Sequence, residues 1–319
     1  MTVHSDATGR MVINPQFDRA NKFSDGLAAV RIGGYLTAKW GFIDKQGKMV
    51  INPQFDQSIF YFGGFSDGLA AVRIDDYKTV KWGYIDKQGT MVINPQFDHA
   101  SKFSDGLAAV CIGDHKTGKW GYIDKQGTMV INPQFDNAYW FSDGLAAVRI
   151  GDDKTGKSGY IDKQGTMVIN LQFDAADPFY DGLAAVRIGD DKTGKSGYID
   201  KQGKMVINPQ FDQSIFYFSE FSDGLAAIRT GDHKTGKWGF IDKQGTMVIN
   251  PQFDGANEFS DGLAPVLVGD HKTGKWGFVD KQGTMVINPQ FSIAGSFSDG
   301  LATVRIGDYE TGKWGYISR

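Results

Sequence analysis

The sequence predicts an all-β protein made of eight tandem repeats of about 38 residues, most simply arranged as a closed eight-bladed β-propeller. The motif Met-Val-Ile-Asn begins eight times between Met11 and Met285, with a period of 38 residues that two copies extend by four. The composition agrees with strands and tight turns, because 42 glycines recur beside Asp, Asn and Lys and 13% of residues are aromatic. No part of the sequence favours a helix.

The first predicted strand of each copy is Met-Val-Ile-Asn-Pro-Gln-Phe, as at residues 49–55. Its proline has no N–H to donate to a sheet, so this strand is predicted to lie at an edge or to carry a bulge. It follows the loop Asp-Lys-Gln-Gly, whose glycine suits a tight hairpin. Each first strand should therefore pair with the last strand of the preceding copy.

The second and third strands are Leu-Ala-Ala-Val-Arg-Ile and Lys-Trp-Gly-Tyr-Ile, joined by a longer loop such as Gly-Asp-His-Lys-Thr-Gly. The second strand is mostly apolar on both faces, which indicates small sheets stacked against neighbours on either side. Its small residues suit an inner strand of a blade. The link between the first and second strands, such as residues 97–105, could hold a short fourth strand or only a loop.

The two ends of the chain complement each other. The sequence begins inside one hairpin and stops at the other half of one, so residues 11–17 are predicted to pair with residues 313–317 and seal the propeller. The alternative is an open superhelix, or solenoid, of hairpins. In either case we expect a single domain over residues 1–319, with residues 1–8 a polar or disordered extension.

The repeated motif closely resembles the bacterial WG-repeat family. It reads Lys-Trp-Gly-Tyr/Phe-Ile-Asp-Lys-Gln-Gly, then Met-Val-Ile-Asn-Pro-Gln-Phe-Asp, then Phe-Ser-Asp-Gly-Leu-Ala-Ala-Val, and it spans residues 9–319. The chain departs from it at Ser158 and Ser196 for tryptophan, Leu171 for proline and Ser292 for aspartate. The resemblance implies β-rich interaction modules without an assigned chemistry.

Charge and hydropathy exclude several classes of function. The 34 Lys and Arg residues are outnumbered by 37 Asp and Glu and are spread evenly, which argues against nucleic-acid binding. No apolar run is long enough to span a membrane, and the polar start lacks the apolar centre of a signal peptide. A lone cysteine, Cys111, excludes an internal disulfide. We therefore expect a soluble, monomeric, cytoplasmic protein without membrane or nucleic-acid partners.

Two segments, residues 151–158 and 189–196, match the phosphate-binding loop pattern G-x-x-x-x-G-K-S. Such a loop needs a helix after it, whereas Gly-Tyr-Ile-Asp-Lys-Gln-Gly predicts a strand and a turn. The sister copies carry tryptophan or a variant loop there, so the match reflects substitution within a repeat. We interpret neither segment as a nucleotide site.

The sequence predicts no catalytic residues, no metal site and no cofactor. The Asp-rich turns lack the spacing of a calcium-binding loop. The histidines lie in different copies without the spacing of metal ligands, and we interpret them as solvated turn residues: His4, His99, His115, His233 and His271.

Arginine recurs on the second strand of six copies, where it could form a belt that binds an anion or an acidic peptide: Arg31, Arg73, Arg149, Arg187, Arg229 and Arg305. The alternative is an ion pair within each repeat, with the aspartate of Ser-Asp-Gly or of Ile-Asp-Lys, because arginine is rarely buried without a partner.

The four-residue insertions in copies two and six add aromatic residues to one loop of each. Exposed aromatic side chains mark interfaces or sugar-stacking surfaces. We therefore predict a ligand-binding or partner-binding role for Phe60, Tyr61, Phe62, Phe216, Tyr217 and Phe218. The alternatives are a local cap on the core, or the trace of a duplication of four repeats.

Together these patterns predict a non-catalytic scaffold that mediates protein–protein interaction. The alternative is a lectin-like protein with several equivalent carbohydrate sites. The partner is accordingly expected to be a protein or a glycan.

Overall fold

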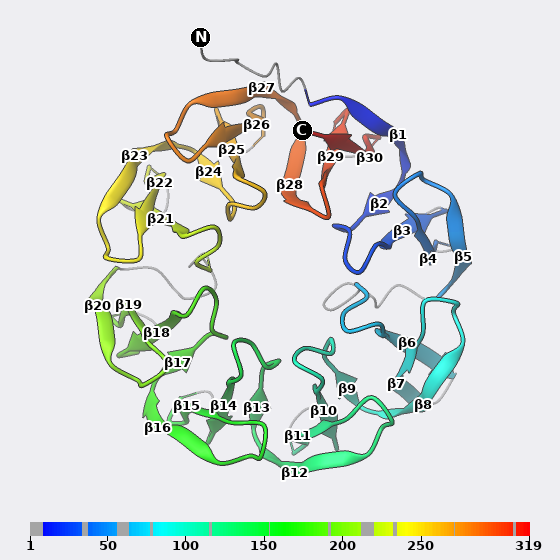
Figure 1. Ribbon diagram of the computed structural model, residues 1–319, viewed down its shortest axis with the longest axis vertical. Coiled ribbons are helices and arrows are strands. Elements are labelled where there is room, and N and C mark those ends of the chain that lie inside the picture. The colour runs from blue at the N-terminus through cyan, green and yellow to red at the C-terminus, as the bar shows by residue number, and fades with distance from the viewer. Residues whose placement is uncertain are drawn as a thin grey trace. The chain divides into compact units, whose positions relative to one another are not determined.

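The computed structural model describes residues 9–33, 38–55, 64–76, 79–114, 117–152, 154–190, 193–211, 220–231, 235–270, 272–308 and 311–319. These residues form eight antiparallel sheets, six of four strands and two of three, and no helix occurs among them. The sheets are the blades of an eight-bladed β-propeller, which confirms the predicted fold class (Figure 1).

The contacts within the chain divide it into two compact units, Met1–Pro53 with Phe221–Arg319, and Gln54–Glu220. The single domain over residues 1–319 stays a prediction.

The strand that begins Met-Val-Ile-Asn is an edge strand in every sheet, as the proline of seven copies predicts, and Leu171 takes the place of that proline in β16. Strand β12, for example, pairs with β11 irregularly. Tyr122 lies opposite Ile131, and the register shifts on both sides of this pair, as at a β-bulge. These edge strands are β1 (Met11–Phe17), β5 (Met49–Phe55), β8 (Met91–Phe97), β12 (Met129–Phe135), β16 (Met167–Phe173), β20 (Met205–Phe211), β23 (Met247–Phe253) and β27 (Met285–Phe291).

The strands that carry the Trp-Gly pair, or Ser-Gly in two copies, lie next to these edges. They are β4 (Lys39–Ile43), β7 (Thr79–Ile85), β11 (Lys119–Ile123), β15 (Lys157–Ile161), β19 (Lys195–Ile199), β22 (Lys237–Asp242), β26 (Lys275–Asp280) and β30 (Lys313–Ser318).

The Ala-rich strands follow in each sheet and are buried along most of their length, as expected for strands covered on both faces. They are β3 (Ala28–Ile32), β6 (Ala70–Asp76), β10 (Ala108–Ile112), β14 (Ala146–Ile150), β18 (Ala184–Ile188), β21 (Leu225–Thr230), β25 (Leu263–Val268) and β29 (Leu301–Ile306).

A further strand forms the other edge of the four-stranded blades, so the link that sequence left open holds a strand in six copies. This strand, rather than the Ala-rich one, is the edge opposite the proline-containing strand. The six are β2 (Arg19–Ala20), β9 (His99–Ala100), β13 (Asn137–Ala138), β17 (Ala175–Ala176), β24 (Gly255–Ala256) and the longer β28 (Ile293–Ser298).

We number the blades along the chain. Blade 1 is β2–β5, blade 2 is β6–β8, blade 3 is β9–β12, blade 4 is β13–β16, blade 5 is β17–β20, blade 6 is β21–β23 and blade 7 is β24–β27. Blade 8 joins β28–β30 to β1 from the other end of the chain.

The two ends of the chain share blade 8. Strand β1 pairs antiparallel with β30, with Met11 opposite Ile317, Ile13 opposite Tyr316 and Phe17 opposite Trp314 (Figure 1). This is the predicted sealing pair. An open stack of hairpins would leave both strands unpaired, so the pairing argues for the propeller over the superhelix.

Neighbouring blades pack through repeated aromatic pairs. The tyrosine or phenylalanine after Trp-Gly packs against the phenylalanine of the next Phe-Ser-Asp-Gly, as Tyr84 does against Phe103 with ring centroids 4.8 Å apart. The Tyr84 hydroxyl also donates a hydrogen bond of 2.8 Å to the carbonyl oxygen of Ser101. Within each compact unit, a blade therefore contributes part of the core of the next.

Candidate functional site

The recurring arginines occupy one register position on the Ala-rich strands. Each described pair places the arginine opposite the Trp or Ser that starts the Trp-Gly or Ser-Gly dipeptide, as Arg31 faces Trp40 and Arg149 faces Ser158. Of the six predicted belt residues, Arg31, Arg229 and Arg305 belong to the first compact unit, and Arg73, Arg149 and Arg187 belong to the second. A single continuous belt stays a prediction.

Arg149, one of the recurring arginines, forms hydrogen bonds with backbone carbonyl groups. Its Nη1 donates to the carbonyl oxygen of Asp174 in the link to blade 5 at 2.6 Å, and its Nη2 donates to the carbonyl oxygen of Asp152 at 2.9 Å. Here the arginine ties two blades together through backbone carbonyl groups.

In blade 4, the aspartates predicted to form ion pairs with arginine accept hydrogen bonds from backbone N–H groups instead. The aspartate of Ile-Asp-Lys in blade 4, Asp162, accepts the N–H groups of Gln164 and Thr166 in its own turn. The aspartate of Ser-Asp-Gly, Asp143, accepts the N–H of Gly182 in the next copy at 2.8 Å. The ion-pair alternative therefore does not describe the hydrogen bonds of Arg149.

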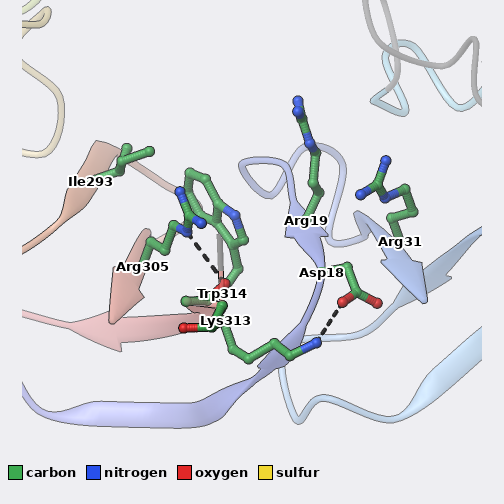
Figure 2. A pocket seen from close by; sticks show the side chains of 9 residues that line it. Asp18, Arg19, Arg31, Ile293, Arg305, Lys313 and Trp314 are labelled. Atoms are coloured by element: carbon green, nitrogen blue, oxygen red, sulfur yellow. Dashed lines mark hydrogen bonds and ion pairs between the residues drawn. The ribbon is translucent and has the colours of Figure 1, made fainter. Parts of the chain in front are cut away.

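A pocket of about 550 Å³ lies between blades 8 and 1, within the first compact unit. Figure 2 shows its charged side chains, which come from β2, β3, β29 and β30 and from the link between β1 and β2. We call this site the arginine pocket. It is lined by Asp18, Arg19, Arg31, Ile293, Arg305, Thr311, Gly312, Lys313 and Trp314.

Local strand pairing places the three guanidinium groups. Arg19 on β2 and Arg31 on β3 are cross-strand partners, so their side chains rise side by side (Figure 2). Arg305 on β29 lies between its two cross-strand partners, Ile293 on β28 and Trp314 on β30. The pocket thus receives two arginines from blade 1 and one from blade 8.

Burial differs among these arginines. Arg19 is exposed, Arg31 is half-buried, and Arg305 retains only 7% of its accessible surface. The Nε of Arg305 donates to the carbonyl oxygen of Gly312 at 3.3 Å. The Nε of Arg31 is buried and has no hydrogen-bond partner among the described residues. A buried donor without an acceptor is unfavourable, so an acceptor that enters the pocket would stabilise it.

Asp18 supplies the only carboxylate among the lining residues that the structure describes. Its Oδ1 accepts a hydrogen bond from Lys313 Nζ and its Oδ2 accepts the N–H of Gly33 at 2.9 Å. Burial acts to raise the pKa of Asp18, but these hydrogen bonds and the charges of Lys313 and Arg31 outweigh it and lower the pKa. The pocket therefore has four cationic side chains and one charged carboxylate that is already engaged.

Sequence reasoning found Arg31 and Arg305 but missed Arg19, Lys313 and Trp314 as members of one site. A signal for Arg19 was present. The equivalent position in the other copies with a described short strand holds His99, Asn137, Ala175, Gly255 and Ile293. Arg19 is therefore the one arginine among these six positions.

The repeats of the chain are similar to those of a known family. The family model described as "WG containing repeat" matches eight segments: residues 5–35, 40–77, 82–114, 120–154, 159–192, 197–232, 238–270 and 276–314. The chain belongs to the WG-repeat family. No curated protein matches its sequence.

Several solved structures share the fold of this WG-repeat chain. A crystal structure of a eukaryotic initiation factor matches with a TM-score of 0.63 and 12% identity, over 98% of this chain and 88% of the other. A prolyl endopeptidase matches with a TM-score of 0.57 and 11% identity, over 92% and 54%. Prolyl oligopeptidase B from Galerina marginata matches with a TM-score of 0.54 and 11% identity, over 98% and 50%. The chain spans about half the length of these two peptidases, and at such identities the likeness shows the fold alone.

Other predicted sites of the WG-repeat chain fall partly outside the described residues. The aromatic residues of both insertions, Phe60, Tyr61, Phe62, Phe216, Tyr217 and Phe218, lie there, and their predicted role stays untested. So do His4, His115, His233 and His271. His99 is described, and the prediction of a turn residue is wrong for it, because it lies in strand β9 and stacks on Trp120 with ring centroids 6.2 Å apart.

The two segments that match the phosphate-binding loop pattern, residues 151–158 and 189–196, form hairpin loops in the parts that the structure describes. The N–H of Gly156 donates to the carbonyl oxygen of Asp152, and strand β15 follows at once. Lys157, which a nucleotide site would use, forms an ion pair with Asp174.

Metal-ligand clusters and reactive thiols would be further sites of chemistry. Within the described part of the chain, no group of three His, Cys, Asp or Glu side chains could hold a metal. Burial, reinforced by the charge of Asp98, raises the pKa of the Cys111 thiol to about 11. Since the described segments consist of strands and turns, they offer no helix with the length and apolarity needed to cross a membrane.

A second irregular cluster lies in the second compact unit, where WG repeats 4 to 6 depart from their neighbours. Tyr180 stands where the other seven copies have serine, Trp140 and Asp177 stand at positions that vary among the copies, and Lys102 Nζ lies 4.5 Å from the centroid of the Trp140 ring. Burial, followed by the charge of Glu220, raises the pKa of Asp177 to about 8. This carboxyl group is therefore largely protonated at neutral pH.

Proposed function

We propose that this WG-repeat chain is a non-catalytic scaffold that binds another protein. The observation that carries the proposal is the arginine pocket, which offers binding groups rather than reacting ones. Its single carboxylate, Asp18, is held in its charged form by Lys313 and the N–H of Gly33 and is thus poorly suited to accept a proton. Guanidinium groups bind anions and stay protonated throughout the physiological range.

The repeat architecture supports the same proposal. Hairpin loops join the strands within each blade and are held by packed sheets, and binding residues are commonly carried on loops positioned by such a scaffold. The solved structures of similar fold include an initiation factor and peptidases, so the fold alone does not select an activity.

The test is affinity capture with the full-length chain, followed by reconstitution with the purified candidate partner. We expect one protein to bind saturably with a stoichiometry near one, measured by isothermal titration calorimetry. A glycan array with strong hits and a stoichiometry well above one would favour the lectin-like alternative and overturn the proposal. Capture of no protein that reconstitutes a complex would also overturn it.

A further inference from the structure

We propose that the arginine pocket between blades 8 and 1 binds carboxylate side chains of an acidic segment in the protein partner. The inference rests on the proposed scaffold function and specifies which surface and which partner chemistry that function uses. Its physical basis is the convergence of Arg19, Arg31 and Arg305 on one cavity beside Trp314.

Guanidinium geometry favours a planar, two-oxygen acceptor. Arginine presents its N–H donors in a rigid fork that matches a carboxylate through two parallel hydrogen bonds. Arg19 and Arg31 stand on adjacent strands of blade 1, while Arg305 comes from blade 8. An acidic residue in the pocket is thus approached by donors from two sides.

The degree of burial indicates that such a contact would be strong. Arg305 is almost fully buried, and the Nε of Arg31 is buried with no acceptor among the described residues. Electrostatic attraction is stronger away from bulk water, and an entering carboxylate would compensate for the dehydration of the Arg31 guanidinium. Arg19 is exposed and can attract the ligand from solvent.

The charge of the pocket is a local property. The whole chain carries a net charge of −3, yet four of the residues that line the pocket are cationic and one is acidic. The net charge of the whole chain gives an acidic segment no general attraction, whereas the pocket attracts it. This arrangement selects one docking position rather than general adhesion.

The size and lining of the pocket favour a peptide segment over a small inorganic anion. A volume of about 550 Å³ is in the range of sites that hold drug-sized ligands, and much larger than a single anionic group requires. Trp314 and Ile293 provide apolar surface beside Arg305. A carboxylate flanked by an apolar side chain would use both kinds of lining.

Arg149 provides an internal comparison, because it has the same register position in blade 4. Its Nε, like that of Arg31, is buried without a hydrogen-bond partner among the described residues, but its Nη1 and Nη2 already donate to backbone carbonyl groups, so it has fewer donors to offer a ligand. In the arginine pocket the repeated arginine is reinforced by the cross-strand Arg19. Binding is therefore expected at this pocket and not at the Arg149 position.

The experiment measures fluorescence anisotropy of the full-length chain with a fluorescein-labelled peptide, Gly-Glu-Glu-Ile-Glu-Glu-Gly. The matched peptide has glutamine in place of every glutamate. The lead variant is Arg19→Glu, which changes an exposed side chain. Arg10→Glu is its charge-matched control, because Arg10 is also exposed and does not line the pocket. Arg31→Gln and Arg149→Gln form a second matched pair, and thermal melting verifies that each variant is folded.

We expect the glutamate peptide to bind with a stoichiometry of one and the glutamine peptide to bind at least about tenfold more weakly. Arg19→Glu and Arg31→Gln should each weaken binding by about tenfold or more, whereas Arg10→Glu and Arg149→Gln should change it less than about twofold. Equal affinity for the two peptides, or an equal effect of Arg10→Glu and Arg19→Glu, would overturn the proposal. Inorganic phosphate that displaces the peptide at comparable concentration would also overturn it, in favour of a small-anion site.

The captured partner separates this inference from the scaffold proposal. If the partner binds the Arg19→Glu and Arg31→Gln chains as well as it binds the parent chain, the pocket assignment is wrong and the scaffold function stands. If no partner reconstitutes a complex with the parent chain, the scaffold function fails, while the peptide measurement still decides whether the pocket binds carboxylates.

Discussion

At the scale of single residues, aspartates adopt a backbone conformation that few other residues accept. The aspartate of each Asp-Gly-Leu-Ala turn has a positive φ, for example 56° at Asp105, and the following glycine does too. Aspartate tolerates this left-handed region better than most residues with a Cβ. Oδ2 of Asp105 also accepts the N–H of Gly144 in the next copy at 2.9 Å. The side chain therefore shapes its own turn and holds the neighbouring one.

This double role makes Asp105 sensitive to truncation. We predict that Asp105→Ala lowers the free energy of unfolding by about 1–2 kcal/mol, because both the tolerated turn and the link to Gly144 are lost. Asp105→Asn keeps the backbone preference and an oxygen acceptor, so it should cost no more than about half a kcal/mol. Urea denaturation measures both. Equal losses for the two variants would contradict the role of the acceptor.

The half-buried Asp177 predicts a pH dependence of stability. Its pKa rises from about 3.9 in the unfolded chain to about 8 in the folded one, so the folded state retains a proton that the unfolded state releases. Stability from this group is present below pH 4 and is lost as the pH rises toward 8. Asp177→Asn removes the titration and should stabilise the chain at pH 9 relative to the parent, with a smaller gain at pH 5. Urea midpoints at both pH values test this, and a gain independent of pH would contradict it.

At the scale of elements, the glycine of the Trp-Gly strand leaves the space that the bulged edge strand occupies. The bulge in β12 brings its backbone against Gly121 of β11, so a Cβ at Gly121 would meet the carbonyl oxygen of Ile131 and lie 2.7 Å from the nitrogen of Pro133. Glycine is needed because the partner strand occupies the space of a side chain.

Gly121→Ala should therefore lower the free energy of unfolding by about 2–3 kcal/mol through overpacking. Gln134→Ala, on an exposed position of the same edge strand, is the control and should change it by less than about 0.5 kcal/mol. Chemical denaturation with a two-state fit gives both values. If Gly121→Ala matches the control, the strands can separate at the bulge and the close approach is not a constraint.

At the scale of the whole molecule, blade 8 depends on both ends of the chain. Strand β1 buries Ile13 and Phe17 in the core shared by blades 8 and 1, and it covers the edge of β30. The blade thus has no complete hydrophobic face until residues from both ends are present.

Deleting residues 1–17 should destabilise the chain by about 3–6 kcal/mol, from the loss of two buried apolar side chains, and leave β30 with an open edge that promotes self-association. Val12→Thr, at an exposed position of β1, should leave stability nearly unchanged. Thermal melting and size-exclusion chromatography test both. A synthetic peptide of residues 9–19 should restore the truncated chain, and a monomeric truncated chain with the parent melting temperature would contradict the prediction.

The repeat period was sufficient to predict the blades and their edge strands. The signals for an edge strand are local, because the proline and the Asp-Lys-Gln-Gly turn belong to the same hairpin. It did not decide the short strands such as β2, since Arg19 and Ala20 carry no alternation from which a strand could be inferred. The arginine pocket was predicted only in part. Arg31 and Arg305 stand at repeated positions, but their meeting beside Trp314 depends on pairing between segments from opposite ends of the chain.

The shared blade also has a consequence for synthesis on the ribosome. Tyr316 donates a hydrogen bond to the carbonyl oxygen of Asn21, a contact across 295 residues. At ordinary translation rates of about 5–20 residues per second, roughly 15–60 s pass between the emergence of these two partners. Throughout that interval the apolar side of β1 has no strand to pair with, so we expect nascent β1 to be prone to aggregation until β30 has emerged.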